Sequence, residues 1–335
     1  MDEKKRILLG HGGGGLLTRN LIDEEILKRF GDGPLRGLPD GALLPSIDGD
    51  IVFSTDSFVV SPGFFPGGNI GDLAVHGTVN DIAVSGATPL WLSLALIIEE
   101  GLPLASLQTV LDSVRTAADN CGVQVVTGDT KVVRKGQCDG LYVNTAGIGK
   151  KIAGFNLGSS QVQTGDRVLV SGNLGDHGMA VMAAREGLGN GALKSDSAPV
   201  HRLVHALSPF AADVRFMRDP TRGGMAATLN EIVDGADVGI LLREDSLPFS
   251  AGAKGLAEML GFDLLHVASE GRMMCICSAE AAEQVIEKWR SLPEGTDACE
   301  IGRITEDSGR VILETGIGGK RIVDVPQGEL LPRIC

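Results

Sequence analysis

The sequence predicts an α+β fold made of two successive units, each combining a few strands with amphipathic helices. Three observations point to it: strand-like runs come in adjacent pairs, aromatic residues make up only 4% of the chain, and the pattern begins again after Gly154. Cores of Val, Leu, Ile and Ala are typical of helices packed on sheets. At 335 residues the chain is long enough for two such units. Adjacent strand pairs favour two α+β domains over one parallel sheet.

The first half of the chain alternates strand and helix patterns around a glycine run and a Gly/Pro-rich passage. An amphipathic helix is clearest where apolar residues recur at spacings of three and four before Gly122. In order, the predicted elements are a strand at 6–9, a helix at 16–30, a strand at 51–60, helices at 69–84 and 104–121, and strands at 123–127 and 140–148.

The second half repeats the pattern and ends in a polar segment with two prolines and no period. Its predicted elements are a strand at 167–171, helices at 177–186 and 224–233, strands at 238–242, 264–268 and 273–277, a helix at 279–290, and strands at 300–304 and 310–314. We therefore divide the chain into a glycine-rich segment (1–42), an N-terminal domain (43–154), a C-terminal α/β domain (155–325) and a flexible tail (326–335).

Composition excludes several classes of function. A net charge of −13 argues against a nucleic-acid or anionic-membrane partner, because both require clustered Lys and Arg. The chain begins without the apolar stretch of a secretory signal, and no run approaches the roughly 20 apolar residues of a membrane-spanning helix. We expect a cytoplasmic protein. The pair Cys275 and Cys277 lies in an apolar run, which favours two core residues over a metal site.

The glycine run at residues 10–15 contains the pattern GxGxxG between a strand and a helix. A dinucleotide-binding unit would then need a second buried strand ending in an acid, and a Gly/Pro passage stands there instead. No Walker loop is present, because no Gly-Lys-Ser/Thr follows. A backbone rich in free N–H groups is suited to lie over phosphates, with a flexible linker as the alternative. The candidate phosphate-binding residues are Gly12, Gly13, Gly14 and Gly15.

Five aspartates stand next to Gly, Ser, Thr, Asn or Pro in short polar motifs: Asp40, Asp56, Asp81, Asp129 and Asp219. Each one alone is more often a turn or cap residue than a ligand. Asp81 lies on the small-residue face of its predicted helix, where a carboxylate must be paired or bound to a metal. Together the aspartates indicate Mg²⁺-nucleotide chemistry, which reconciles an acidic chain with an anionic substrate.

Several of these runs, in their order along the chain, resemble the motifs of the HypE family of hydrogenase maturation proteins. They are GHGGGG, STDSFVVSPGFFPGGNIGDLAVHGTVNDIAVSGA, GDTKVV, GDHG, DPTRGG and the terminal PRIC. The family is related to aminoimidazole ribonucleotide (AIR) synthetase, thiamine-monophosphate kinase and selenophosphate synthetase. The aspartate motifs are shared with those relatives, whereas the glycine run together with PRIC distinguishes HypE. The resemblance spans essentially the whole chain.

The resemblance implies a two-domain PurM-like fold whose N-terminal domains pair into a β-barrel in a homodimer, with ATP between the two domains of each subunit. It assigns Mg²⁺-ATP contacts to Asp40, Asp56, Asp81, Asp129 and Asp219. It also implies the activity of an ATP-dependent carbamoyl dehydratase. The carbamoyltransferase HypF would load a carboxamide onto Cys335, dehydration would give a thiocyanate, and the HypC–HypD complex would receive the cyanide ligand for the iron centre of a NiFe hydrogenase.

That chemistry requires a base for the nitrogen protons and a cation for developing negative charge. Glu270 follows an apolar strand, where desolvation would raise the basicity of its carboxylate. Lys131, two residues after Asp129, could hold phosphate. The alternatives are that Glu270 pairs with Arg272 and that Lys131 is merely exposed. No chemistry is assigned to the histidines that stand within motifs: His11, His76 and His177.

Cys335 is the last residue of a segment whose prolines resist helix formation. Ten extended residues reach about 35 Å, enough to carry a thiol between an internal site and a partner's site.

Two other classes of function stay open. A related ATP enzyme that phosphorylates a small molecule would not need Cys335, and a non-catalytic maturation scaffold would not turn over ATP.

Overall fold

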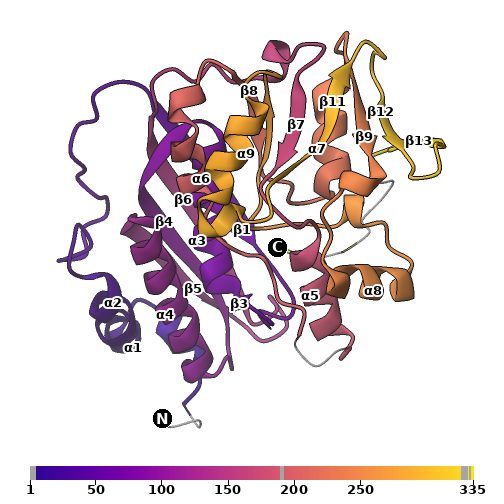
Figure 1. Cartoon of the computed structure of the whole chain (residues 1–335). Helices are drawn as coiled ribbons and strands as arrows, with labels where there is room; N and C mark the ends of the chain where they lie inside the picture. Colours follow the sequence, from indigo (N-terminus) through magenta and orange to yellow (C-terminus); the bar gives the residue numbers. More distant parts are fainter. Residues whose placement is uncertain (1–4, 189–191, 326–330, 332) are drawn as a thin grey trace.

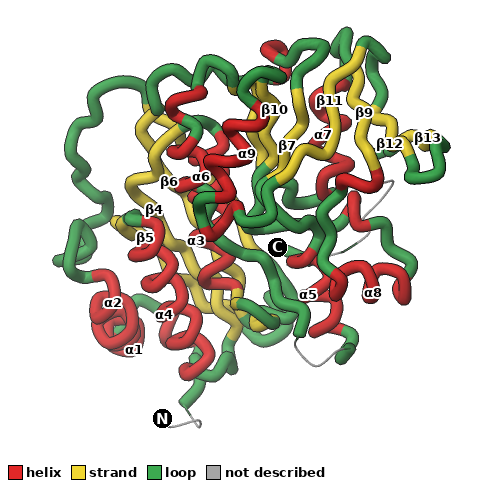
Figure 2. Tube along the Cα trace, viewed as in Figure 1, coloured by secondary structure: helices red, strands yellow, loops and turns green. Residues whose placement is uncertain are grey.

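The computed structural model describes residues 5–188, 192–325, 331 and 333–335. The chain forms two units, each built on its own sheet, and the C-terminus lies between them (Figure 1). Loops gather around this point (Figure 2). The predicted α+β architecture with two successive units is confirmed. Among the described residues, no helix has both the length and the apolar character needed to cross a membrane.

The first unit is a four-stranded sheet with two helices on one face (Figure 1). In sheet order the strands are β1 (Ile51–Phe58), β6 (Leu141–Lys151), β4 (Ala87–Glu99) and β5 (Gln124–Val133). The helices are α3 (Ile70–Val84) and α4 (Leu104–Cys121). Only the β4–β5 pair is parallel. A short hairpin, β2 (Phe64–Phe65) and β3 (Gly68–Asn69), precedes α3.

Local chemistry explains why α3 begins and sits where it does. Asn69 caps the helix by accepting a hydrogen bond from Gly71 N at 2.8 Å, and Asp72 accepts from Asn69 N at 2.7 Å. A Cβ on Gly77 would stand 2.7 Å from the ring of Phe58, so only glycine lets α3 approach β1 this closely. At the other helix, Gly122 ends α4 in the left-handed conformation with φ 68°.

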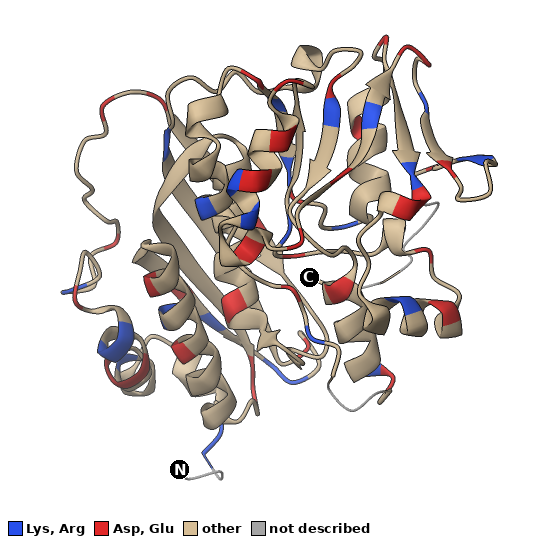
Figure 3. Cartoon of the chain, in the orientation of Figure 1, with Lys and Arg blue, Asp and Glu red and all other residues tan. Residues whose placement is uncertain are grey.

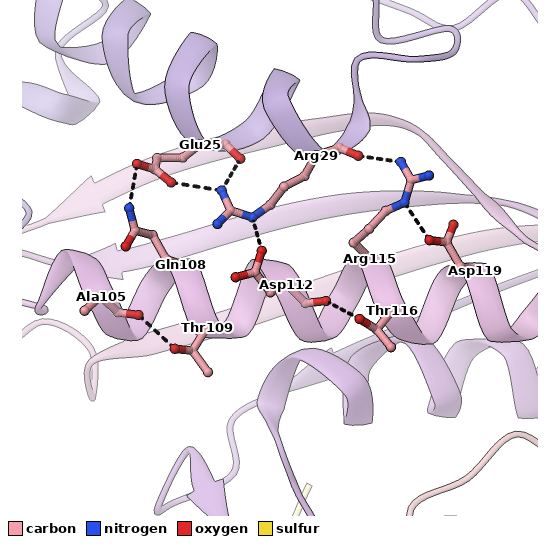
Figure 4. Close-up of polar contacts among 9 residues, drawn as sticks. All are labelled: Glu25, Arg29, Ala105, Gln108, Thr109, Asp112, Arg115, Thr116 and Asp119. Atoms are coloured by element: carbon pink, nitrogen blue, oxygen red, sulfur yellow. Dashed lines mark hydrogen bonds and ion pairs between the residues drawn. The ribbon is translucent and has the colours of Figure 1, made fainter. Parts of the chain in front are cut away.

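The N-terminal segment is fixed onto α4 by a polar network (Figure 4). Its predicted helix is present as α1 (Leu16–Leu21), a π-helical turn (Ile22–Leu27) and α2 (Lys28–Phe30). Arg29 donates to Asp112 of α4 at 2.6 Å and to Glu25 at 2.9 Å. Gln108 of α4 donates to the other Glu25 oxygen at 2.9 Å. Because the Arg29 side chain is largely buried, this pair orients the segment more firmly than an exposed ion pair would.

The second unit is a seven-stranded, mostly antiparallel sheet. In sheet order its strands are β13 (Lys320–Ile322), β12 (Val311–Glu314), β9 (Gly239–Arg243), β11 (Cys299–Thr305), β7 (Arg167–Val170), β10 (Met274–Cys277) and β8 (Val214–Arg218). The helices of this half are α5 (Asp176–Arg185), α6 (His201–Ala206), α7 (Gly224–Val233), α8 (Ala251–Leu260) and α9 (Ala282–Arg290).

Successive side chains of a strand point to opposite faces of the sheet, so this sheet packs against a separate core on each face. Val168 and Val170 join the core formed with α7, whereas Leu169 joins the core formed with α6 and α9. Cys275 and Cys277 are fully buried in the latter, as expected for core residues. Ala83 and Val84 at the end of α3 belong to this core too. The two units are therefore joined through packed side chains.

Two predicted strands are wrong. Residues 6–9 make only one bridge, from Arg6 to Pro103, and residues Leu9–Gly12 form a 3-10 helix because glycines supply no side chains to pack in a sheet. Residues 264–268 begin with a 3-10 helix instead. Asp263 caps that helix by accepting from Leu265 N at 3.0 Å, and both Leu264 and Leu265 are buried.

The sequence reading also missed several elements, namely β4, α6, β8, α8 and β13. The longest of them, β4, starts at Ala87, only three residues after the end of the helix predicted at 69–84. Its apolar residues occupy both faces, since Leu92 is buried while Ile97 is exposed, so its pattern does not alternate. The short elements lack enough residues for a period to be recognised.

Candidate functional site

A groove of about 510 Å³ separates the two units beside the carboxylate-bearing elements. Its walls come from β1, from the end of α3, and from β8 with the turn that follows it. Asp81 and Asp219 face it from opposite units, and Arg218 and Lys151 are its cationic lining. The volume falls within the range of ligand pockets in proteins. The groove is therefore large enough for a small ligand held between the units.

Four acidic side chains meet beside this groove: Asp56 of β1, Asp81 of α3, Asp219 and Glu270. Burial raises the pKa of Asp56 and of Asp81, and for Asp56 the nearby Asp81 adds to the effect. For the fully buried Asp219, burial first and then repulsion from Asp81 raise the pKa to about 7. Ser54 moderates the charge by donating to Asp81 at 2.7 Å. The structure thus brings together three of the five predicted aspartates.

Glu270 is the most deeply buried member of the cluster, with 2% of its surface exposed. Burial first, and then repulsion from Asp219, raise its pKa well above the ordinary carboxyl value. Its Oε1 finds no hydrogen-bond partner among the residues that the structure describes. Within the described part of the chain Glu270 forms no ion pair with Arg272, whose Nε lies 3.8 Å from Asp196 instead.

The backbone of Glu270 is held from both units. Its N–H donates to Asp196 at 3.0 Å, and its carbonyl accepts from Asn80 of α3 at 3.1 Å. Asn80 also donates to Ala198 O at 3.0 Å and accepts from Val200 N at 2.8 Å. All three side-chain bonds of the buried Asn80 therefore go to the second unit. The residue beside Asp81 thus fixes the position of Glu270 relative to the other carboxylates.

Cys335 enters the same cluster. Burial raises the pKa of its thiol to about 12, and repulsion from Glu270 adds to this effect. The nearby Arg222 guanidinium favours the thiolate and so partly opposes the rise in pKa. Of the expected flexible tail, residues 326–330 and 332 lie outside the described residues, while residues 331 and 333–335 are packed between the units. Both acidic and basic positions surround the C-terminus (Figure 3).

Asp129 and Lys131 lie in a different place, on edge strand β5. They line a second cavity of about 290 Å³ together with Gly12 and Gly14 of the glycine run. Lys131 is 65% exposed and pairs with Asp129 at 2.8 Å, and this hydrogen bond lowers the pKa of Asp129. Three strand spacings of about 4.8 Å separate β5 from β1, so Asp129 and Asp56 are roughly 14 Å apart across the sheet.

The register also places these side chains on opposite faces of the sheet. Asp129 is aligned with Ala95, Asn144 and Ser57 across the four strands. Ser57 is exposed, whereas its neighbour Asp56 points towards the α3 side. Because side chains alternate along a strand, Asp129 points to the face that α3 and α4 leave uncovered. One chain alone therefore does not bring Asp129 into the carboxylate cluster.

The remaining predicted residues lie near the second cavity or outside both. Any side chain on Gly12 would clash with Val132 N at 2.8 Å, and Gly14 has a φ of +77°. Gly13 lies between these two glycines, and Gly15 follows them. Asp40 is exposed in the passage before β1 and is not among the residues that line either cavity.

Sequence reasoning missed Arg222 and His177 as residues near Cys335. Arg222 stands within the motif DPTRGG, of which only Asp219 is predicted as a site residue. Its position before two glycines and the start of α7 was the available signal. His177 stands in GDHG without any metal-ligand spacing to indicate a role, yet its Nε2 lies 2.8 Å from Ile334 O of the tail.

The cluster fits a magnesium ion that is held jointly with a polyphosphate. Among the described residues, no three Asp, Glu, His or Cys side chains are close enough to hold an ion by themselves. Mg²⁺ usually takes one or two protein carboxylates and completes its shell with substrate phosphates and water. The unpartnered Glu270 oxygen and the mutual repulsion of the carboxylates indicate that the site accommodates added positive charge.

The fold and these two cavities define a class of protein. Residues 39–150 match the N-terminal domain of AIR synthase related proteins, and residues 163–314 match the C-terminal domain of the same proteins. These matches confirm the predicted PurM-like, AIR synthetase-like fold. The chain is thus an AIR synthase related protein with two domains.

Comparison with individual proteins narrows the class. The chain is 45% identical to carbamoyl dehydratase HypE of Azotobacter vinelandii over 327 residues, which cover 97% of this chain and 96% of the relative. A crystal structure of HypE in complex with ATP is 40% identical, has a TM-score of 0.93, and is matched over 98% of this chain and 99% of that one. A crystal structure of a HypE–HypF complex matches with 44% identity and a TM-score of 0.80, covering 91% and 99%. The chain belongs to the carbamoyl dehydratase HypE family, as its motifs predicted.

Proposed function

We propose that this protein catalyses the ATP-dependent dehydration of a carboxamide on the Cys335 thiol to a thiocyanate, which supplies cyanide for the iron centre of a NiFe hydrogenase. The observation that carries the proposal is the position of Cys335. Its thiol lies beside Glu270 and Arg222, next to the carboxylates that border the groove between the units. Membership of the HypE family, in which one homologous structure holds ATP, supports the same reaction.

The reaction balances in two steps. The amide oxygen of the S-carboxamide attacks the γ-phosphorus of ATP, ADP leaves, and the nitrogen loses its first proton to give an O-phosphorylated thioimidate. Loss of the second nitrogen proton then expels phosphate and leaves S–C≡N. An amide oxygen is a poor leaving group, and phosphorylation makes its departure possible. The net change is removal of water from the carboxamide with conversion of ATP to ADP and phosphate.

The residues around the thiol fit these steps. Glu270 is placed to take the nitrogen protons, because its raised pKa makes its carboxylate a stronger base than an ordinary one. Arg222 is placed to hold the substrate end of the tail and to offset negative charge. One or two of Asp56, Asp81 and Asp219 would contact Mg²⁺ together with the phosphates and water, and the ion's role when bound would be to neutralise phosphate charge.

The same proposal assigns phosphate contacts to the second cavity, whose Asp129 and Lys131 would point towards the second subunit of the dimer described below. The glycine run, with Gly12 and Gly14 in its lining, would lie over phosphates, and Lys131 would contact them or the developing charge. Asp129 and Asp40 would serve as further metal ligands. The chain would comprise the glycine-rich segment 1–42, the N-terminal ATP-binding and dimerisation domain 43–154, the C-terminal domain 155–325 and the tail 326–335. HypF would load the tail and the HypC–HypD complex would receive the cyanide, all in the cytoplasm; a HypE–HypF crystal structure supports the first of these partners.

The decisive experiment measures ATP turnover with and without a carbamoylated tail and follows the protein by intact mass. Turnover that depends on the carboxamide, together with loss of one water from the modified protein, is the expected result. ATP turnover that phosphorylates a small molecule and ignores the tail would indicate the related kinase-like enzyme. Tail-dependent partner binding without turnover would indicate a scaffold.

Asp81→Asn should weaken Mg²⁺-ATP binding and leave the fold unchanged. The amide keeps the size of the side chain but loses its charge, so one of the carboxylates available to the ion is removed. Calorimetric titration with Mg²⁺-ATP should show about tenfold weaker binding, which corresponds to about 1.4 kcal/mol. Asp237→Asn, at an exposed position after α7, is the matched control. Equal affinity in both variants would exclude Asp81 from the nucleotide site.

We also propose that the protein is a homodimer joined through the uncovered face of the four-stranded sheet. Apolar side chains stand exposed there, with Ile51 at 58%, Phe53 at 65% and Ile97 at 42%. An exposed apolar sheet face of this kind marks an interaction surface. Two such sheets facing each other would close into the β-barrel of related proteins. Asp129 and Lys131 would then point towards the second subunit, which explains their separation from Asp56 within one chain.

Phe53→Asp should convert the dimer to a monomer, because it places a charge on the exposed apolar face proposed as the interface. Sedimentation velocity at micromolar protein measures the change. Ile322→Asp, which alters an exposed apolar residue of β13, should leave the dimer intact. Dimerisation that survives Phe53→Asp, or that is absent in the unmodified protein, would contradict this interface.

A further inference from the structure

The last three residues of the chain are fixed by a continuous series of hydrogen bonds to their carbonyl groups. Cys335 O accepts from Val59 N at 3.1 Å, and Arg333 O accepts from Ser61 N at 3.1 Å. These two bonds pair the tail with the strand-like segment that follows β1. The carbonyl between them, on Ile334, points the other way, towards α5.

His177 of α5 holds that middle carbonyl. Its Nε2 lies 2.8 Å from Ile334 O, and its Nδ1 lies 2.8 Å from the Ser195 hydroxyl. A carbonyl only accepts, so Nε2 carries the proton and Nδ1 accepts from Ser195. Ser195 in turn accepts from Ser197 N at 3.0 Å, which directs its hydroxyl proton to the histidine. Burial lowers the pKa of His177 to about 4, so the ring stays neutral and this tautomer is preserved at physiological pH.

Arg185, two helical turns after His177 on α5, holds the neighbouring carbonyl. Its Nη2 donates to Arg333 O at 2.9 Å and to Ser61 O at 2.6 Å, and its Nε donates to Ser61 O at 3.0 Å. One guanidinium therefore bridges the tail and the segment with which the tail pairs. A Cβ on Gly178 would stand 2.5 Å from Val267 and 3.3 Å from Leu331, so this glycine mainly lets α5 approach Val267 and leaves only a tight fit against the tail.

We propose that His177 and Arg185 form a latch that positions the carrier cysteine in the site and sets how readily the tail leaves it. Donation to Ile334 O fixes the peptide plane that leads into Cys335, and so fixes the direction of its side chain. A thiol held in this way is only partly exposed and faces Glu270 and Arg222 between the units, so its presentation to a partner requires these bonds to break. The two residues act through the tail and not on the reacting atoms. They are positioning residues, and the inference rests on the proposed carrier function of Cys335.

Two substitutions of His177 separate the bond to the tail from the rest of its packing. A glutamine places its amide nitrogen where Nε2 stands and can still donate to Ile334 O. An asparagine places its amide near Nδ1, so it retains a polar contact with Ser195 but cannot reach the tail. The rate of alkylation of Cys335 by iodoacetamide, followed by peptide mass spectrometry, reports the released fraction of the tail. Cys121 and Cys299 in the same protein report any general loosening.

We expect Cys335 in His177→Asn to react about fivefold faster than in the unmodified protein, the effect of one lost hydrogen bond, and His177→Gln to stay near the original rate. The ratio of the rate of carbamoyl loading by HypF to the rate of dehydration should rise about fivefold in His177→Asn only. If these variants fail to fold, Arg185→Met compared with Arg185→Lys makes the same test.

Equal alkylation of Cys335 in the Asn and Gln variants would overturn the latch. So would a parallel fall in loading and dehydration, because a merely structural residue would affect both. If the unmodified protein accepts no carbamoyl group at all, the proposed function fails, yet the alkylation rates still decide whether the latch exists.

Discussion

Replacing Cys335 by alanine should abolish every carbamoyl or cyano mass addition while ATP binding stays nearly unchanged. The thiol sulfur is the atom to which the carboxamide is attached, so no other group in the site replaces it. The side chain lies at the end of the chain and contributes little to either sheet, so the melting temperature should change only slightly. Intact mass spectrometry after incubation with HypF, carbamoyl donor and ATP measures the effect.

Cys299→Ala is the matched control for this experiment. Cys299 is half-buried in β11, where its sulfur lies 3.6 Å from Ser246 O, far along the sequence from the tail. This variant should be loaded and dehydrated normally. A carbamoyl group found on another cysteine of the Cys335→Ala protein would contradict the carrier role and the mechanism that depends on it.

Replacing Glu270 by glutamine should leave carbamoyl loading normal and slow dehydration by at least about a hundredfold, the usual contribution of a general base. The amide is nearly isosteric with the carboxyl group, but it cannot accept a proton from nitrogen. If loading takes place with the tail released, as proposed above, it does not involve Glu270. Single-turnover conversion of the preloaded protein to thiocyanate, quenched and weighed by mass spectrometry, separates the two steps.

The pH dependence of the dehydration step should follow the same residue. A base acts only in its deprotonated form, and burial and neighbouring carboxylates raise the pKa of Glu270. The rate should therefore rise with pH through a midpoint above the ordinary carboxyl value, and fall as Glu270 becomes protonated at lower pH. In Glu270→Gln the residual rate should lose this dependence.

Asp166→Asn tests whether removal of any buried carboxyl has the same effect. Asp166 is buried beside β7 and has a pKa raised by burial, but its partners are Gln163 N and Arg215. Its substitution should leave the rate of dehydration within about twofold of the original. The change affects only the contacts of Asp166 with Gln163 and Arg215 and no group proposed to act in catalysis. Full conversion to thiocyanate by Glu270→Gln would exclude Glu270 as the base.

The sequence by itself determined the class of fold, the family and most of the candidate residues. Local patterns predict an element reliably where a helix has one apolar face, as in α4, or where neighbouring residues form the helix cap, as at Asn69. They are weak where apolar residues occupy both faces of a strand, as in β4, and where an apolar run is short, as at Leu264, where a 3-10 helix forms instead of the predicted strand. Consecutive motifs identified the family because each carries its own chemistry.

Only the tertiary structure decided which of the candidate residues meet. Asp56, Asp81, Asp219, Glu270 and Cys335 are separated by up to 279 positions along the chain, and no local pattern records their convergence. Asn80 brings Glu270 to the aspartates through bonds between the units, and the docked tail adds the thiol. Strand register sends Asp129 and Lys131 to the other face of the sheet. Packing between distant segments sets these positions, because side-chain direction depends on the neighbouring strand and not on the residue itself.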